Sequence, residues 1–137
     1  MVTLKTVLRL NASTCVGFGL LFISLPNTVS QFLSLDNSAP EWVLSILGVG
    51  LISQGLHLIW ASYQKKPNKG LILYFSMGDF VWVLASLVLM TCQLWISSPM
   101  GIVSSSLVAI VVGVLGVMQL QSYKYEHCAY TTKKGTA

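Results

Sequence analysis

The sequence predicts an all-α integral membrane protein, a four-helix bundle with up-down-up-down topology. Of its 137 residues, 54% are hydrophobic and only 9% are charged, whereas about a quarter of the residues in a soluble domain carry a charge. Lipid accepts such an apolar surface without penalty. Four apolar stretches are each long enough to cross the roughly 30 Å hydrocarbon core of a bilayer. They define a single transmembrane domain over residues 1–137, with spans near 7–25, 41–62, 71–96 and 100–121.

The first span follows a short polar lead, carries Arg9 and Asn11, and is closed by Pro26. Small residues recur in it at the four-residue spacing that lets membrane helices approach closely: Ser13, Cys15, Gly17 and Gly19. A basic start before an apolar run also describes a secretory signal peptide, and Thr28-Val29-Ser30 offers a weak cleavage site. The run is longer than a usual signal core, so we expect a retained span, with cleavage as the alternative.

The second span follows a polar loop, residues 30–39, that contains no Lys or Arg. Trp42 and Trp60 bracket the span 18 residues apart, which corresponds to roughly 27 Å of helix and suits two interfacial anchors. Three glycines predict close packing of this helix against a neighbour: Gly48, Gly50 and Gly55.

Residues 63–70, YQKKPNKG, form the clearest break in the chain, a turn in water before the third span. An uncharged turn at residues 97–99 leads into the fourth span, in which small residues again repeat every four positions: Ser105, Ala109 and Gly113. The polar tail over residues 122–137 is expected to be frayed.

The basic residues are confined to the amino end, the middle loop and the carboxyl end of the chain. The set comprises Lys5, Arg9, Lys65, Lys66, Lys69, Lys124, Lys133 and Lys134. An even number of spans puts these three segments on one side, and the positive-inside rule makes that side the cytoplasm. We therefore expect a multi-pass protein of the cell inner membrane with both termini cytoplasmic. The charges form no continuous basic patch, which argues against a nucleic-acid partner.

Asp79 lies within the third apolar span, where a charge costs about 3 kcal/mol or more and normally faces other helices. Counting inward from the predicted helix ends places several polar side chains in the same cytoplasmic half of the bilayer: Arg9, Asn11, Gln54, His57, Asp79 and Gln119. Gln54 and His57 share a helix face that could turn toward Asp79. The predicted intramembrane polar cluster is therefore Asp79, His57, Gln54, Arg9 and Asn11.

Two interpretations of this cluster follow. In the functional one, Asp79 and His57 line a small cavity open to the cytoplasm and bind a cation, relay a proton or hold a polar head group. In the structural one, Asp79 pairs with Arg9, or accepts hydrogen bonds from Gln54 or Asn11, and fixes the register of the bundle. We favour the structural interpretation.

Metal, cofactor and enzyme chemistry find no support in the sequence. The three cysteines, Cys15, Cys92 and Cys128, form no CxxC pair and lie on different segments, which argues against a disulfide framework or a zinc site. His57 lacks a second strong ligand within the spans for a metal or haem. The serines at positions 104–106 have no nearby base. No cofactor, no metal site and no catalytic activity are expected.

The segment Gly78-Asp79-Phe80-Val81-Trp82 looks like a short family signature. In span count, length and charge placement the chain resembles small four-span bacterial inner-membrane proteins of unassigned function, with a looser topological likeness to DoxX-like proteins. Small multidrug exporters share the span count, but their essential acid lies on the first helix, where this chain has Arg9. The resemblance implies a topology and no specific chemistry.

The expected function is non-catalytic, with the chain acting through intramembrane helix contacts as an accessory subunit or a binding or immunity-type protein. Its expected partners are the lipid bilayer and either another membrane protein or a second copy of itself. The alternative is a small transporter or channel that uses Asp79. A membrane enzyme is the third and least supported class, because the sequence contains no catalytic motif.

Overall fold

The computed structural model describes residues 3–34, 36–64 and 68–135, with side chains described up to Tyr125 and at Cys128. Every regular element in these ranges is a helix: α1 (Leu4–Ser24), α2 (Pro26–Leu33), α3 (Glu41–Tyr63), α4 (Lys69–Thr91) and α5 (Pro99–Gly135). Four of them, α1, α3, α4 and α5, are long and apolar enough to cross a membrane. The predicted all-α class is thereby confirmed.

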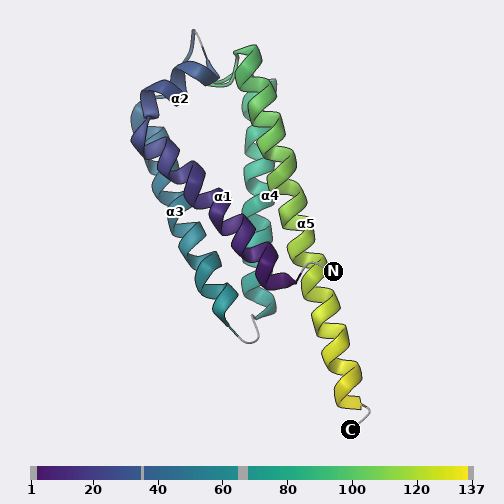
Figure 1. Cartoon of the computed structure of the whole chain (residues 1–137). Coiled ribbons are helices and arrows are strands. Elements are labelled where there is room, and N and C mark those ends of the chain that lie inside the picture. The colour runs from purple at the N-terminus through teal and green to yellow at the C-terminus, as the bar shows by residue number, and fades with distance from the viewer. Residues whose placement is uncertain (1–2, 35, 65–67, 136–137) are drawn as a thin grey trace.

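The four long helices alternate in direction along the bundle (Figure 1). The chain rises through α1, crosses over in the short α2, descends through α3, rises through α4 and descends again through α5. The start of α1, the end of α3 and the start of α4 lie at one end, here called the terminal end, and α5 continues past it. The opposite end, formed by α2 and the α4–α5 connection, is called the α2 end. This arrangement is the predicted up-down-up-down topology.

Local sequence explains most helix boundaries. The Thr3 side chain accepts a hydrogen bond from the Thr6 amide at the start of α1, and the Asn68 side chain accepts one from the Gly70 amide at the start of α4. Leu25, with φ of −135°, separates α1 from α2. Pro26 then occupies the first turn of α2, where its fixed φ favours a helix and its missing amide hydrogen is not needed. Residues 30–33, expected in a loop, are therefore helical.

The third span and the tail also differ from the sequence expectation. Helix α4 ends at Thr91 instead of position 96, because the chain leaves helical geometry at Gln93 and Trp95, whose φ angles are 50° and 62°. The segment remains apolar, so hydropathy alone extends the helix too far. The expected frayed tail is helical as far as Gly135. Its sequence contains no proline, and its first glycine is at that end, so a helix already formed propagates through it.

Helices α1 and α3 form the most closely packed pair, and α4 and α5 form the next. A Cβ atom on Gly19 would lie 2.8 Å from the Gly48 carbonyl oxygen, and one on Gly48 would lie 2.8 Å from the Gly19 carbonyl oxygen. Only glycine permits this crossing. Gly17 and Gly50, by contrast, face open space. Between the two pairs, the backbone of α1 approaches α5 but does not come close to α4, so side chains must span the distance between α1 and α4.

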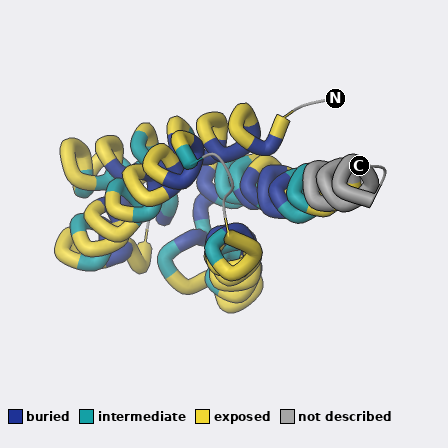
Figure 2. The backbone as a smooth tube through the Cα atoms, turned by 90° about the horizontal axis from the view of Figure 1, so that it is seen from below, coloured by how far each residue is buried: buried dark blue, intermediate teal, exposed yellow. Residues whose placement is uncertain are grey.

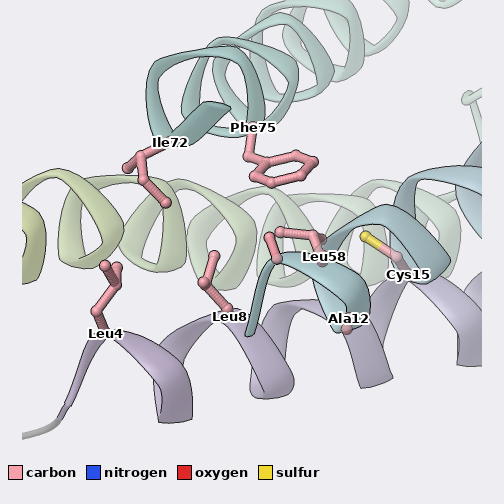
Figure 3. Packing of buried hydrophobic residues seen from close by; sticks show 8 residues of the cluster. Leu4, Leu8, Ala12, Cys15, Leu58, Ile72 and Phe75 are labelled. Atoms are coloured by element: carbon pink, nitrogen blue, oxygen red, sulfur yellow. The ribbon is translucent and has the colours of Figure 1, made fainter. Parts of the chain in front are cut away.

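An apolar cluster joins the helix pairs near the terminal end. Leu4, Leu8, Ala12 and Cys15 of α1 lie in a row facing Leu58 of α3 and Ile72 and Phe75 of α4 (Figure 3). Figure 2 shows the buried stretches of the helices turned toward one another and the exposed stretches turned outward. The outward side chains include many large apolar residues, as a surface in contact with lipid requires.

At the α2 end, hydrogen bonds join the end of α2 to the segment that follows α4. The amides of Ser97 and Ser98 both donate to the Leu33 carbonyl, at 3.1 and 3.0 Å. The Ser98 hydroxyl donates to the Phe32 carbonyl at 2.6 Å, and the Ser34 and Ser97 hydroxyls lie 2.8 Å apart. The irregular segment after α4 is thus anchored on the end of α2.

Candidate functional site

Asp79 lies at the centre of a three-helix hydrogen-bond arrangement. Its Oδ2 atom accepts from Asn11 Nδ2 of α1 and from Gln119 Nε2 of α5, both at 2.8 Å. Asp79 is 4% exposed, and Asn11 and Gln119 are completely buried. We call these three residues the polar lock. Because they come from three different helices, they fix the rotation and register of those helices, which a lipid-facing apolar surface alone does not do.

The close approach of α4 and α5 positions the lock. A Cβ atom on Gly116 would lie 3.2 Å from Asp79 Cβ, closer than ordinary van der Waals contact, so any larger residue here would have to displace Asp79 by a few tenths of an ångström. One turn away from Asp79, the Ser76 hydroxyl donates to the Gly116 carbonyl at 2.9 Å. Gln119 follows Gly116 by three residues and therefore lies on the same face of α5, next to the carboxylate.

The lock has more acceptors than donors. Both amide donors bond to Oδ2, so Oδ1 accepts no hydrogen bond from the described residues. Gln119 Oε1 is buried and also lacks a partner there. Buried polar atoms are normally hydrogen-bonded, and a buried charge is normally paired. The site is therefore complementary to a hydrogen-bond donor or a positive charge.

A cavity of about 210 Å³ adjoins Asp79 at mid-depth, between all four long helices. Its polar lining comes from Asp79, Gln54 and Thr14, and its aromatic lining from Phe18 and Trp82. The remaining lining is mainly aliphatic. The carboxylate is therefore accessible from a small, mostly apolar chamber inside the bundle.

The structure brings some of the predicted cluster residues together and separates others. Asp79 and Asn11 are directly hydrogen-bonded, and Gln54 lines the same cavity as Asp79. His57 is exposed, and its Nδ1 atom lies 2.9 Å from the Ser53 carbonyl of its own helix. Arg9 is exposed too, with its guanidinium carbon 5.4 Å from the centre of the Tyr63 ring. Neither of these two basic side chains takes part in the lock.

Gln119 is the lock residue that the predicted cluster omits. Depth counting placed it in the same half of the bilayer as Asp79, but near the predicted end of the last span. The signal that could have identified it is the Gly116–Gln119 spacing, a glycine and an amide three residues apart on one helix face.

A second hollow runs along the outside of the α4–α5 pair. This outer groove has a volume of about 690 Å³ and is lined by α4 at Val83 and Leu87 and by α5 between Ser106 and Gln121. Ala109 and Gly113, two residues of the predicted small-residue stripe, form part of it.

Among the described side chains, no group of three His, Cys, Asp or Glu residues is close enough to hold a metal ion. Comparison with protein-family models, with curated proteins and with solved structures finds no match for this chain. The two hollows and the polar lock are therefore the features from which a function can be inferred.

Proposed function

We propose that this chain is a non-catalytic multi-pass protein of a bacterial inner membrane that acts through helix contacts within the bilayer, as an accessory subunit or a binding or immunity-type protein. The outer groove along α4 and α5 is the observation that carries this proposal. The polar lock supports it, because Asp79, the buried acid within a described span, is hydrogen-bonded to two other helices, which suits a structural role.

The shape of the groove favours a helix as its occupant. Its α5 lining extends from Ser106 to Gln121, about four helical turns or roughly 22 Å. A Cβ atom on Gly113 would meet only Val83, at an ordinary distance of 3.6 Å, so a backbone can come close at this position. Ile110 and Val114, 65% and 52% exposed, offer apolar contacts beside it. We assign the groove to one apolar transmembrane helix of a partner protein.

The test is to purify the tagged full-length chain in a mild detergent and to measure the mass of the complex by native mass spectrometry. We expect a stoichiometric partner that is lost in Gly113→Leu and retained in Gly50→Leu. Gly50 is the matched control, because it is a glycine on α3 that faces open space. A homodimer lost in Gly113→Leu would identify a second copy as the occupant. A monomer without a companion, or equal effects of both substitutions, would contradict the proposal.

The charge distribution supports cytoplasmic termini. Lys5 lies in the first turn of α1 and Lys69 begins α4, so both are at the terminal end, whereas Asp36 and Glu41 are at the α2 end. Positive charge accumulates on the cytoplasmic side of inner-membrane proteins. Four further lysines of the predicted set lie outside the described residues or have undescribed side chains: Lys65, Lys66, Lys133 and Lys134.

The central cavity favours one second candidate, a small transporter or channel that uses Asp79. An ionisable residue lining a cavity at mid-membrane is a common feature of substrate and ion pathways. Flux of protons or monovalent cations into vesicles containing the purified protein, compared with Asp79→Asn, tests this candidate. Absence of flux with the parent protein would eliminate it.

A further inference from the structure

We propose that the central cavity binds one small organic ammonium ion, with Asp79 as its counter-ion. This inference goes beyond the proposed function, because it requires neither a partner helix nor transport across the membrane. It rests on the charge of the site, on the unused acceptor atoms and on the size and lining of the cavity.

The charge of Asp79 has no counter-ion among the described side chains around it. Its two hydrogen-bond donors are neutral amides. The basic side chains on α1 and α3 are exposed, with Arg9 lying against Tyr63 and His57 bonded within its own helix. An ionised carboxylate inside a bilayer is stabilised strongly by a nearby positive charge. A cation bound in the cavity would supply that charge.

The free acceptor atom of Asp79 matches an N–H donor in the cavity. Asp79 lines the cavity, and its Oδ1 atom accepts nothing from the described residues. Gln119 Oε1, next to this carboxylate but outside the cavity lining, is a second buried acceptor without a donor among the described residues. A primary or secondary ammonium ion has both the charge and the N–H groups that this imbalance calls for.

Cavity size selects a small ligand. The volume of about 210 Å³ corresponds to roughly seven waters at about 30 Å³ each. Pockets for drug-sized molecules begin near 300 Å³. The cavity is therefore too large for a bare metal ion alone and too small for a large drug-like cation.

The lining selects an organic cation over a hydrated metal ion. Two aromatic residues, Phe18 and Trp82, line the cavity, and aromatic rings attract ammonium groups. Phe22 stacks on Trp82, with ring centroids 6.4 Å apart, and so helps to fix the indole ring. A hard metal ion would need about six oxygen ligands, whereas the lining is mostly hydrocarbon. An alkyl-substituted ammonium ion meets both the acid and the apolar walls.

The experiment is isothermal titration calorimetry on the full-length protein in detergent, with dimethylammonium chloride as the probe and sodium chloride at equal ionic strength as the reference. We expect saturable binding of one dimethylammonium ion per chain and no binding of the uncharged analogue isopropanol. Asp79→Asn should weaken binding about tenfold or more, because it removes the charge but keeps the shape of the side chain. Glu41→Gln, at an exposed acid, should leave the affinity unchanged.

A second variant keeps the test decisive if Asp79→Asn does not fold. Val112→Phe enlarges a buried side chain of the cavity lining and leaves the lock residues in place, so it should abolish binding while the chain remains helical by circular dichroism. Absence of saturable binding by the parent protein would overturn the proposal, as would undiminished binding by Asp79→Asn or by Val112→Phe. None of these outcomes depends on whether a partner copurifies, so failure here and failure of the proposed function are distinguishable.

Discussion

The close crossing of α1 and α3 predicts that even a substitution of Gly48 by alanine destabilises the protein. In Gly48→Ala, the added Cβ atom would lie 2.7 Å from Ile23 Cγ1 and 2.8 Å from the Gly19 carbonyl oxygen. The isoleucine side chain can move aside, but the carbonyl belongs to the backbone of α1. Ordinary van der Waals contact begins near 3.4 Å, so the two helices must separate by about 0.6 Å at this point.

The expected magnitude combines two opposing effects. Overpacking of a well-packed contact destabilises a protein by about 1–3 kcal/mol. Replacing glycine by alanine inside a helix recovers up to about 1 kcal/mol of helix propensity. Because the added atom meets backbone, the upper part of the overpacking range applies, about 2–3 kcal/mol. Subtracting about 1 kcal/mol of helix propensity, we expect Gly48→Ala to lower the free energy of unfolding by about 1–2 kcal/mol. Gly50→Ala gains the same propensity without any contact, because nothing lies within 4 Å of the added atom, and should be neutral or slightly stabilising.

The assay is reversible unfolding of each variant in mixed micelles with increasing mole fraction of dodecyl sulfate, followed by far-ultraviolet circular dichroism. The two glycines lie on the same helix, so differences in insertion or micelle binding cancel in the comparison. If Gly50→Ala destabilised the protein as much as Gly48→Ala, or if both were neutral, the inferred α1–α3 crossing would be refuted.

Two further predictions address other helix contacts, and a third addresses the orientation of the chain in the membrane. Ser76→Ala removes the hydroxyl that bonds across to α5 and should lower the unfolding free energy by about 1 kcal/mol; Ser86→Ala, whose hydroxyl bonds within its own helix, should change it by less than about 0.5 kcal/mol. Gly101→Ala places a Cβ atom 2.6 Å from a backbone oxygen at the end of α2, so hydrogen exchange in α2 should accelerate. A membrane-impermeant maleimide should label Cys128 only in inverted vesicles and Asn37→Cys only from outside intact spheroplasts, and the reverse pattern would refute cytoplasmic termini.

The number, order and direction of the long helices could be predicted from the sequence, because lipid imposes a length and a hydropathy that are easy to recognise. The second span, expected over 41–62, is found at Glu41–Tyr63. The end of α4 could not be predicted in the same way. Residues 92–96 are apolar enough to continue a membrane span, and only the backbone conformation at Gln93 and Trp95 shows that the helix has ended.

The candidate site was partly predictable for a related reason. An acidic residue is unusual in an apolar segment, so Asp79 could be identified from the sequence. Counting residues from the predicted helix ends placed Asn11 at a similar depth in the bilayer. The rotation of each helix about its axis could not be predicted from the sequence. Spans that are apolar on all sides have no polar face to show which side is turned outward. As a result Arg9 and His57, close to Asp79 in depth, lie on the outside of the bundle, and Gln119 lies inside it.

The polar lock has a consequence for the biogenesis of this protein. Asn11 precedes Asp79 by 68 residues, and Gln119 follows it by 40. At about 5–20 residues per second, a ribosome needs roughly two to eight seconds to add those 40 residues. Until those residues are added, only one of the two donors to this acid has been synthesised. Synthesis of the final helix supplies the second hydrogen-bond donor to that acid. A chain truncated before Gln119 would therefore keep a carboxylate with only one hydrogen-bond donor in the membrane.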